Sequence, residues 1–457
     1  PRGSAGGPRP LGLIPLVGLI YCLSTAGPFG LEEMVPESGP GLTLLLNLLL
    51  PILYGLPLGL ASGEMGSRFP VEGGYYRWVR RIFGDFWGFQ TGWWSWLGAC
   101  FDGALYAVLV AEYSAPILAA LVPAPYLGVA RQIVCLVVVV VCTWANLRGI
   151  ELVGWSSFAF TLFMLSPFAV MCALGLLHWH HNPLVPFTPP GTGWGTAMGA
   201  GVLIGMWGYS GYESLSTAAE EIEDPRRNYL KAILIVLILT IPTNLMPILI
   251  TLAVTGDWTH LTAGSFADVG RVIGGAPLGF WIAAAGIVSN LALFNAYTLS
   301  YSRLPFAMAQ DGFAPRWLAR THRKYGTPWA AILVGAVTYA ALTFLSARDL
   351  IVLEMWLYSV IYILIYLVLF RLRLRPDLDP GGSEGTYRFI IPLGRWGIWL
   401  VIGPPIALTL YALWNSEASD VKWGGTALLS GVAIYALILL FRRVRGRSEP
   451  AGHPGGP

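Results

Sequence analysis

Acidic side chains inside long apolar stretches are the residues of this sequence with the most evident chemistry. Asp102 lies one helical turn before Tyr106, so both share one helix face, and Glu213 follows a stretch rich in glycine and aromatic residues. No Lys or Arg accompanies them in the middle of their stretches. Because a buried carboxylate needs a proton or a positive partner, these positions predict a binding site for a cation.

An amine would supply that positive charge, and aromatic faces add cation–π attraction of about 0.5–2 kcal/mol each when they are desolvated. We expect the amine to lie between Asp102 and Glu213. The aromatic side chains expected around it are Tyr106, Trp207, Tyr209 and Tyr358. An alternative for Glu213 is that it only accepts backbone hydrogen bonds and so pins a broken helix.

Two helix-breaking interruptions must position these residues. The first, Ser24–Gly30, contains Gly27, Pro28 and Gly30 inside the apolar run 11–35. Non-helical backbone at membrane depth costs several kcal/mol for each unpaired amide, so it survives only inside protein or beside a watery cavity. We therefore interpret it as a binding site, with a Pro kink in a continuous helix as the alternative. The second interruption, 205–214, has the carboxylate of Glu213 near its end.

Two further carboxylates follow the first interruption. Glu32 and Glu33 fall where the second half of the helix should run, and carboxylates inside a spanning segment are by default functional. The alternative is a short half-helix that leaves both side chains in outside water. Of the two, we include Glu33 among the candidate site residues.

The composition is that of a multi-pass membrane protein. Hydrophobic residues make up 55% of the chain, charged residues 12%, and the mean hydropathy is +0.62. Stretches of about 20 apolar residues are long enough to span a bilayer. We expect about twelve, near 11–35, 41–62, 86–118, 130–147, 150–177, 196–219, 230–254, 278–302, 329–346, 350–372, 391–414 and 424–441.

Basic residues alternate between the loops and so predict the orientation. All but four of the 28 Lys and Arg residues fall in every second loop or in the termini; the exceptions are Arg131, Arg271, Arg348 and Lys422. By the positive-inside rule both termini are cytoplasmic, and we expect the plasma membrane. The net charge of +3 reflects this topology and does not predict a nucleic-acid partner.

The positions of the two interruptions, in the first and sixth spans, predict an all-α fold of two inverted five-helix repeats plus two accessory helices, with the site at the membrane midplane. The first repeat covers 11–177 and the second 196–373, joined by an extracytoplasmic loop at 178–195. The accessory spans cover 374–441. Residues 1–10 and 442–457 are cytoplasmic tails.

Other chemistries lack their sequence signals. His178, His180 and His181 form one cluster without partnering carboxylates, so we expect no metal or other cofactor and no enzyme activity. A phosphate-binding loop of the Gly-x-x-x-x-Gly-Lys-Ser/Thr type is absent, which argues against direct ATP coupling. Asn290, Asn295, Thr298 and Ser300 either line the cavity or bond neighbouring helices.

The two interruptions also carry a family resemblance. Ala26-Gly-Pro-Phe-Gly30, paired with Trp207-Gly-Tyr-Ser-Gly-Tyr-Glu213 and the later Glu221-Ile-Glu-Asp-Pro-Arg-Arg, resembles the amino acid/polyamine/organocation transporters, whose fold is the five-plus-five repeat. Gly27-Pro-Phe-Gly-Leu-Glu-Glu and Phe69-Pro-Val-Glu-Gly-Gly-Tyr are similar to the polyamine-uptake branch of plants and trypanosomatids. The sequence departs from that branch at Tyr212-Glu213, where the branch has Trp-Asp.

The resemblance implies a secondary transporter that imports polyamines such as putrescine or spermidine, with protons as the coupling ion. Sodium is the alternative ion, with Thr298 and Ser300 as ligands, and a cationic or neutral amino acid is the alternative substrate. Trp207 would act as a gate over the substrate. The full set of expected site residues is Thr25, Ala26, Gly27, Gly30, Glu33, Asp102, Tyr106, Trp207, Tyr209, Tyr212, Glu213, Asn295 and Tyr358.

Overall fold

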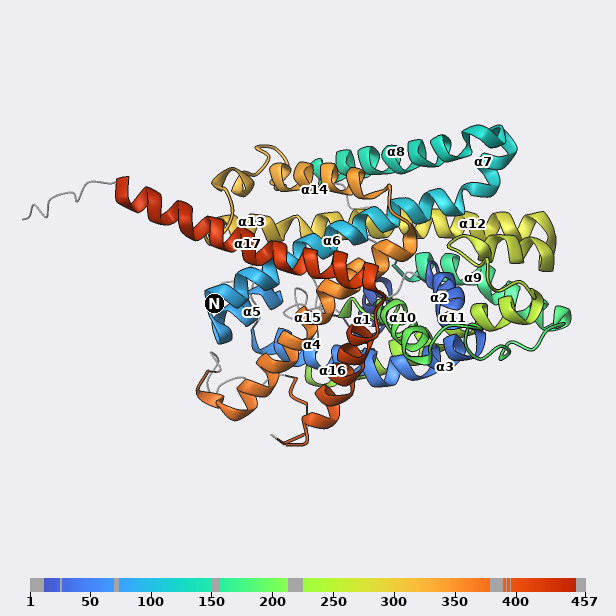
Figure 1. Ribbon diagram of the computed structural model, residues 1–457, viewed down its shortest axis with the longest axis horizontal. Helices are drawn as coiled ribbons and strands as arrows, with labels where there is room; N and C mark the ends of the chain where they lie inside the picture. The colour runs from blue at the N-terminus through green and yellow to red at the C-terminus, as the bar shows by residue number, and fades with distance from the viewer. Residues whose placement is uncertain are drawn as a thin grey trace, which may run out of the picture.

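The computed structural model describes residues 12–24, 27–69, 74–149, 157–212, 225–378, 389–391, 393–394 and 396–448, and this part of the chain contains helices and no strand (Figure 1). Eight helical segments in it are long and apolar enough to cross a membrane, and two shorter apolar helices accompany them. The protein is therefore a multi-pass membrane protein, as its composition predicts. The helices are α1 (Leu13–Ser24), α2 (Met34–Ser38), α3 (Pro40–Leu50), α4 (Leu56–Arg68), α5 (Gly74–Phe83), α6 (Asp85–Tyr113), α7 (Ala115–Leu121), α8 (Leu127–Leu147), α9 (Ser157–Gly175), α10 (Trp194–Trp207), α11 (Pro225–Val254), α12 (Ser265–Tyr301), α13 (Arg303–Gln310), α14 (Trp329–Leu342), α15 (Ala347–Leu374), α16 (Trp399–Trp414) and α17 (Ala418–Ser448).

The first apolar run is interrupted where the sequence predicts. Helix α1 ends at Ser24, and the chain resumes as a 3-10 turn, η1 (Leu31–Glu33), followed by α2. Between them Gly27 and Gly30 have φ angles of 88° and 91°, which other L-residues adopt only at a cost. The interruption is thus a genuine turn, and the alternative of a simple Pro kink is wrong.

The second interruption faces the first. Helix α10 ends at Trp207, and Gly211 has a φ angle of 90°. A Cβ atom added to Gly30 would lie 3.2 Å from the Trp207 ring. One added to Gly208 would lie 2.7 Å from the Leu31 side chain. The glycines therefore let two stretches that are far apart in the sequence pack directly against each other.

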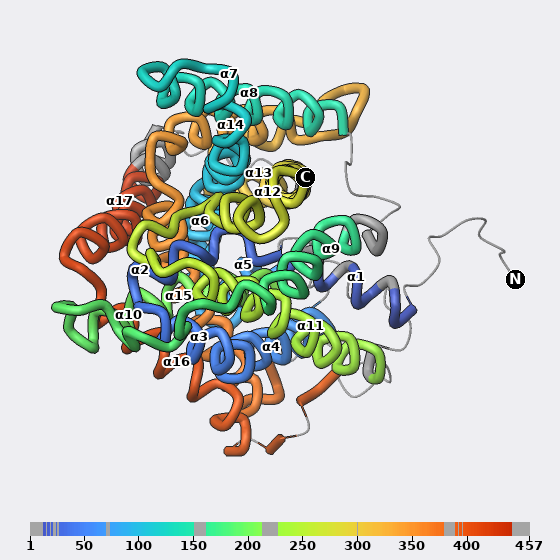
Figure 2. Tube along the Cα trace, turned by 90° about the vertical axis from the view of Figure 1, so that its right-hand side faces the viewer, coloured from blue at the N-terminus to red at the C-terminus, as the bar shows by residue number. Residues whose placement is uncertain are grey.

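Helix α6 forms the centre of the molecule. Most of it is buried, and it packs mainly against α12 and α15, whereas α8, α14 and α17 lie at the periphery (Figure 2). The over-long predicted span 86–118 is split: α6 ends at Tyr113, and α7 begins after Ser114 with Pro116 in its first turn. Pro116 fits a new first turn because its missing N–H has no partner to lose there.

Helix α12 is also two segments. Gly275, with a φ angle of 73°, and Pro277 separate a short outer helix from the predicted span 278–302. The segment just before this outer helix contacts η1 through the Ala263 N–H, so the outer helix belongs to the same end of the molecule as α2 and α7 (Figure 1). We call the end that contains α5 and α13 the basic end, and the end that contains α2 and α7 the opposite end.

Ion pairs fasten each end. At the opposite end Arg348 of α15 bonds Glu37 of α2 at 2.7 Å and Asp420 of α17 at 3.1 Å. At the basic end the buried Glu64 of α4 pairs with Arg373 of α15 at 2.5 Å and accepts the Ile391 N–H at 2.8 Å. Both sets join segments that are distant in the sequence, so each end is cross-linked by ion pairs.

Candidate functional site

A small polar cavity lies between the two interruptions and three helices, α6, α12 and α15. Its volume is about 30 Å³. A water molecule needs about 10–15 Å³ of such space, so only a few waters fit and a diamine does not. The cavity is thus too small for a polyamine in this structure. Its lining residues are Ser24, Gly27, Asp102, Tyr106, Trp207, Gly208, Ser210, Leu293, Tyr297 and Glu354.

Two carboxylates enter the cavity from neighbouring helices. Asp102 of α6 is 2% exposed, and the Tyr106 hydroxyl donates to its Oδ2 atom at 3.0 Å, as the spacing of one helical turn requires. Glu354 of α15 is 4% exposed. Among the described residues that line the cavity there is no Lys, Arg or His. The charged side chains of the cavity are therefore acidic, which suits a cationic ligand.

Aromatic rings form the rest of the wall. The Trp207 ring covers the backbone at Gly30, and the Tyr106 and Tyr297 rings lie 5.4 Å apart between centroids. Tyr297 in turn stacks on Tyr301 at 5.4 Å. These faces lie beside the two carboxylates and would add cation–π attraction to an ammonium group.

Several backbone amides in the described parts of the interruptions are already used. The Gly30 N–H donates to Glu32 Oε2 at 2.7 Å, and the Leu31 N–H donates to the Pro28 carbonyl at 3.1 Å. At the second interruption the Tyr209 and Ser210 N–H groups donate within their own turn. Such amides are the usual partners of a ligand carboxylate at a helix start, so here a carboxylate would have to displace existing bonds.

Glu32 is one of the most constrained side chains of the molecule. It is 1% exposed and accepts from the Gly30 N–H, from the Gly264 N–H at 3.2 Å and from the Tyr113 hydroxyl. The alternative that it sits in outside water is therefore wrong. Glu33 is half-buried and accepts the Ala263 N–H at 2.9 Å. Both carboxylates fasten η1 to the segment before α12, outside the cavity.

The expected site residues are thus only partly gathered. Gly27, Asp102, Tyr106 and Trp207 line the cavity, and Gly30 lies directly beneath the Trp207 ring. Thr25, Ala26 and Glu213 lie outside the described residues.

Other expected residues lie elsewhere. The Tyr209 hydroxyl donates to the Asn47 carbonyl at 3.0 Å, and the Tyr358 hydroxyl bonds that of Tyr301 at 2.9 Å. Tyr212 and Asn295 are buried but are not among the residues that line the cavity.

Several lining residues were not in the expected set: Ser24, Gly208, Ser210, Leu293, Tyr297 and Glu354. Glu354 carries the same signal as Asp102, a carboxylate in an apolar span, and that rule identifies it. Tyr297 carries no such signal, because its place depends on how α12 packs against α6.

Residues 11–438 match the family described as amino acid permease. Polyamine transporter PUT1 from Oryza sativa subsp. japonica is 34% identical over 438 residues, which cover 94% of this chain and 79% of the relative.

Two other relatives are also named as transporters. Polyamine transporter RMV1 from Arabidopsis thaliana is 34% identical over 397 residues, 87% of this chain and 78% of the relative. An uncharacterized transporter from Mycobacterium tuberculosis is 28% identical over 425 residues, 91% of this chain and 89% of the relative. With two interrupted apolar helices around an acidic cavity and a match over nearly its whole length, this chain belongs to the amino acid permease family.

Proposed function

We propose that this protein is a secondary active transporter that imports polyamines such as putrescine and spermidine. The observation that carries the proposal is the small cavity lined by Asp102, Glu354 and aromatic rings, whose described lining residues include no Lys, Arg or His. The relatives named as polyamine transporters support the same substrate class.

The chemistry favours a polyamine over an amino acid. Each carboxylate offers a charge-assisted partner for one ammonium group, and a diamine carries two of them. An amino acid also brings a carboxylate, which would face Asp102 and Glu354 without a cation and would meet amides that Glu32 and Pro28 already occupy.

Transport then requires alternating access around this fixed site. We infer twelve spans in the plasma membrane with both termini cytoplasmic, arranged as two inverted repeats, 11–177 and 196–373. Opening the opposite end would break the bonds of Glu33 and Arg348, and opening the basic end those of Glu64. In this structure both sets of bonds are intact.

Protons are the coupling ion of this proposal. A buried carboxylate binds either a proton or a substrate ammonium group, because the two cations compete for the same oxygen atoms. Sodium is the less favoured coupling ion, because its two alternative ligands lie in different environments. Thr298 is buried, whereas Ser300 is exposed.

Uptake by reconstituted protein tests the proposal. Proteoliposomes with an imposed pH gradient and no sodium should accumulate radiolabelled putrescine, and unlabelled spermidine should compete better than arginine or a neutral amino acid. Asp102→Asn and Glu354→Gln should each lower uptake at least about tenfold, since hydrogen bonds to charged groups are worth about 1.5–3 kcal/mol. Asp257→Asn, an exposed carboxylate in a loop, is the matched control and should transport normally.

Three outcomes would overturn the proposal. One is uptake that requires sodium and ignores the pH gradient, which would reject proton coupling. Another is stronger competition by a neutral amino acid, which would reject the substrate class. The third is unchanged affinity in both cavity variants, which would move the substrate site elsewhere.

A further inference from the structure

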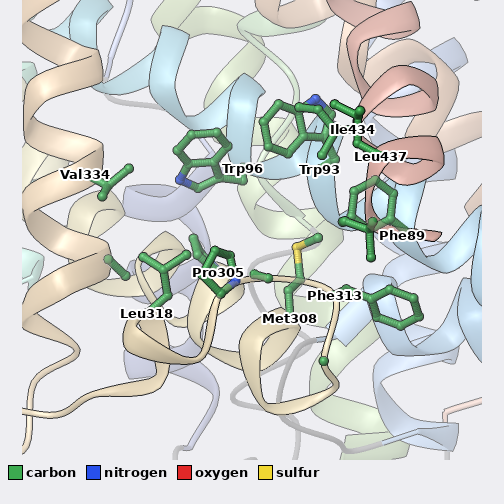
Figure 3. A pocket seen from close by; sticks show the side chains of 15 residues that line it. Phe89, Trp93, Trp96, Pro305, Met308, Phe313, Leu318, Val334, Ile434 and Leu437 are labelled. Carbon is green, nitrogen blue, oxygen red and sulfur yellow. The ribbon is translucent and has the colours of Figure 1, made fainter. Parts of the chain in front are cut away.

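A large apolar crevice lies on the outside of the helix bundle, away from the cavity. It is formed by α6, α13, α14, α17 and the 3-10 turn η7 (Arg316–Ala319), and its volume is about 850 Å³ (Figure 3). Trp93 and Trp96 of α6 lie between Val334 of α14 on one side and Ile434 and Leu437 of α17 on the other. The size is that of sites that bury a whole small ligand.

The lining is almost pure hydrocarbon. The labelled side chains in Figure 3 carry carbon, a thioether sulfur at Met308 and the indole nitrogens of the tryptophans. The indole N–H of Trp93 is already donated to the Ser430 hydroxyl at 2.8 Å. A polar molecule would therefore lose its hydrogen bonds with water in the crevice, and the occupant must be apolar there.

The crevice opens toward the lipid side of the molecule. Leu437 at its edge is 52% exposed, and Val337, one turn from Val334 on α14, is 73% exposed. Helix α17 as a whole is mostly exposed. In a membrane these surfaces meet lipid tails, so the bilayer is the direct source of an apolar occupant.

Charged groups sit at the basic end of the crevice. Phe313, in its lining, lies under the Arg80 guanidinium at 5.0 Å, and Arg80 also pairs with Asp311 at 2.8 Å. Two exposed arginines, Arg316 and Arg320, follow the lining residue Pro315. Together with Arg77 and Asp85, this rim holds four arginines and two aspartates, an excess of positive charge.

We propose that the crevice binds one anionic membrane phospholipid, with an acyl chain between α14 and α17 and the phosphate headgroup at the arginine rim. Apolar walls and a cationic rim at one end match the two parts of such a molecule. The rim lies on the side that the distribution of basic residues assigns to the cytoplasm, where anionic lipids attract Lys and Arg. The lipid also gives α17 a role, because it completes the contact of this helix with α6 and α13.

Lipid retention tests the tail site. Protein from vesicles of equal parts dioleoylphosphatidylglycerol and dioleoylphosphatidylcholine is extracted into detergent, and its bound lipids are counted by native mass spectrometry. We expect one retained phosphatidylglycerol. Val334→Phe fills the crevice and should abolish retention, whereas Val337→Phe, the same change one turn away on the exposed face, should not.

The headgroup is tested separately with an exposed residue, so that misfolding does not confuse the result. Arg316→Gln should weaken phosphatidylglycerol retention about fivefold, the effect of one arginine near an anionic headgroup, and leave phosphatidylcholine unaffected. Arg271→Gln, at the opposite end, should change neither. The proposal would be overturned if the unmodified protein retained both lipids equally, or if Val334→Phe retained lipid fully. It would also be overturned if Val334→Phe lost dimers instead of lipid, because the crevice would then be an interface between two copies of the chain.

Discussion

The interior cavity is small but carries charged side chains, whereas the outer crevice is large and apolar. The cavity has a volume of about 30 Å³, yet Asp102, Glu354 and several aromatic rings converge on it. The crevice is about 850 Å³ and is lined by hydrocarbon and aromatic surface. Volume alone would favour the crevice as the substrate site, whereas charge favours the cavity.

The difference teaches that the substrate site of a transporter is recognised by its polar groups and by where the helices are interrupted. Both interruptions contribute backbone to the cavity, and neither contributes to the crevice. The cavity leaves room for only a few waters beside the carboxylates, whereas the crevice has the volume of a whole small ligand.

Two tryptophans provide the sharpest contrast, because the same substitution is made in each region. Trp207→Ala removes the ring that covers Gly30 and lines the cavity, and we expect uptake to fall at least about tenfold, as for buried aromatic anchors. Trp96→Ala widens the crevice, and we expect uptake to change less than about twofold. Initial rates in proteoliposomes, normalised to protein content, measure both. Equal losses in the two variants would erase the distinction.

A second pair of variants compares the interrupted helix with the periphery. Gly30→Ala places a Cβ 3.2 Å from Trp207 at a φ angle of 91°, and we expect a loss of about 1–2 kcal/mol in stability from the backbone conformation. Gly425→Ala on α17 meets no atom within 4 Å and should be neutral or stabilising. Thermal unfolding in detergent measures both, and an unaffected Gly30→Ala protein would contradict the turn at this position.

Breaking the ion pairs at the opposite end is expected to give a smaller effect. Arg348 is partly buried and bonds both Glu37 and Asp420, so Arg348→Gln leaves these two carboxylates without their shared partner. Because water and salt screen the groups in part, we expect a loss of only about 1 kcal/mol in stability. Cysteine accessibility from outside should also increase at a reporter position beside Gly27. If accessibility stays unchanged, Arg348 does not hold this end closed.

Much of the fold follows from local sequence. The turn at Gly27 and Gly30 was predictable because Gly and Pro interrupt an apolar run, and the helical pair Asp102 and Tyr106 because the spacing fixes one face. The end of α6 at Tyr113 was not predicted, since the stretch stays apolar beyond it and only Pro116 marks a new helix.

The site was less predictable than the fold. Tyr209 and Tyr358 were expected near the ligand for their type, but their hydroxyls bond Asn47 and Tyr301. The place of a tyrosine depends on which helix its face meets, and a single sequence does not encode that contact locally. Glu354 lines the cavity but was not among the expected site residues, although its charge in an apolar span is the same signal that identified Asp102.

Equilibrium binding of radiolabelled spermidine to the purified protein tests the central claim most directly, because it needs neither a gradient nor a complete transport cycle. The account predicts saturable binding at one site, lowered at least about tenfold by Asp102→Asn or Glu354→Gln and unaffected by Val334→Phe in the crevice. Binding that survives both cavity substitutions but is lost in Val334→Phe would contradict it and place the polyamine in the crevice.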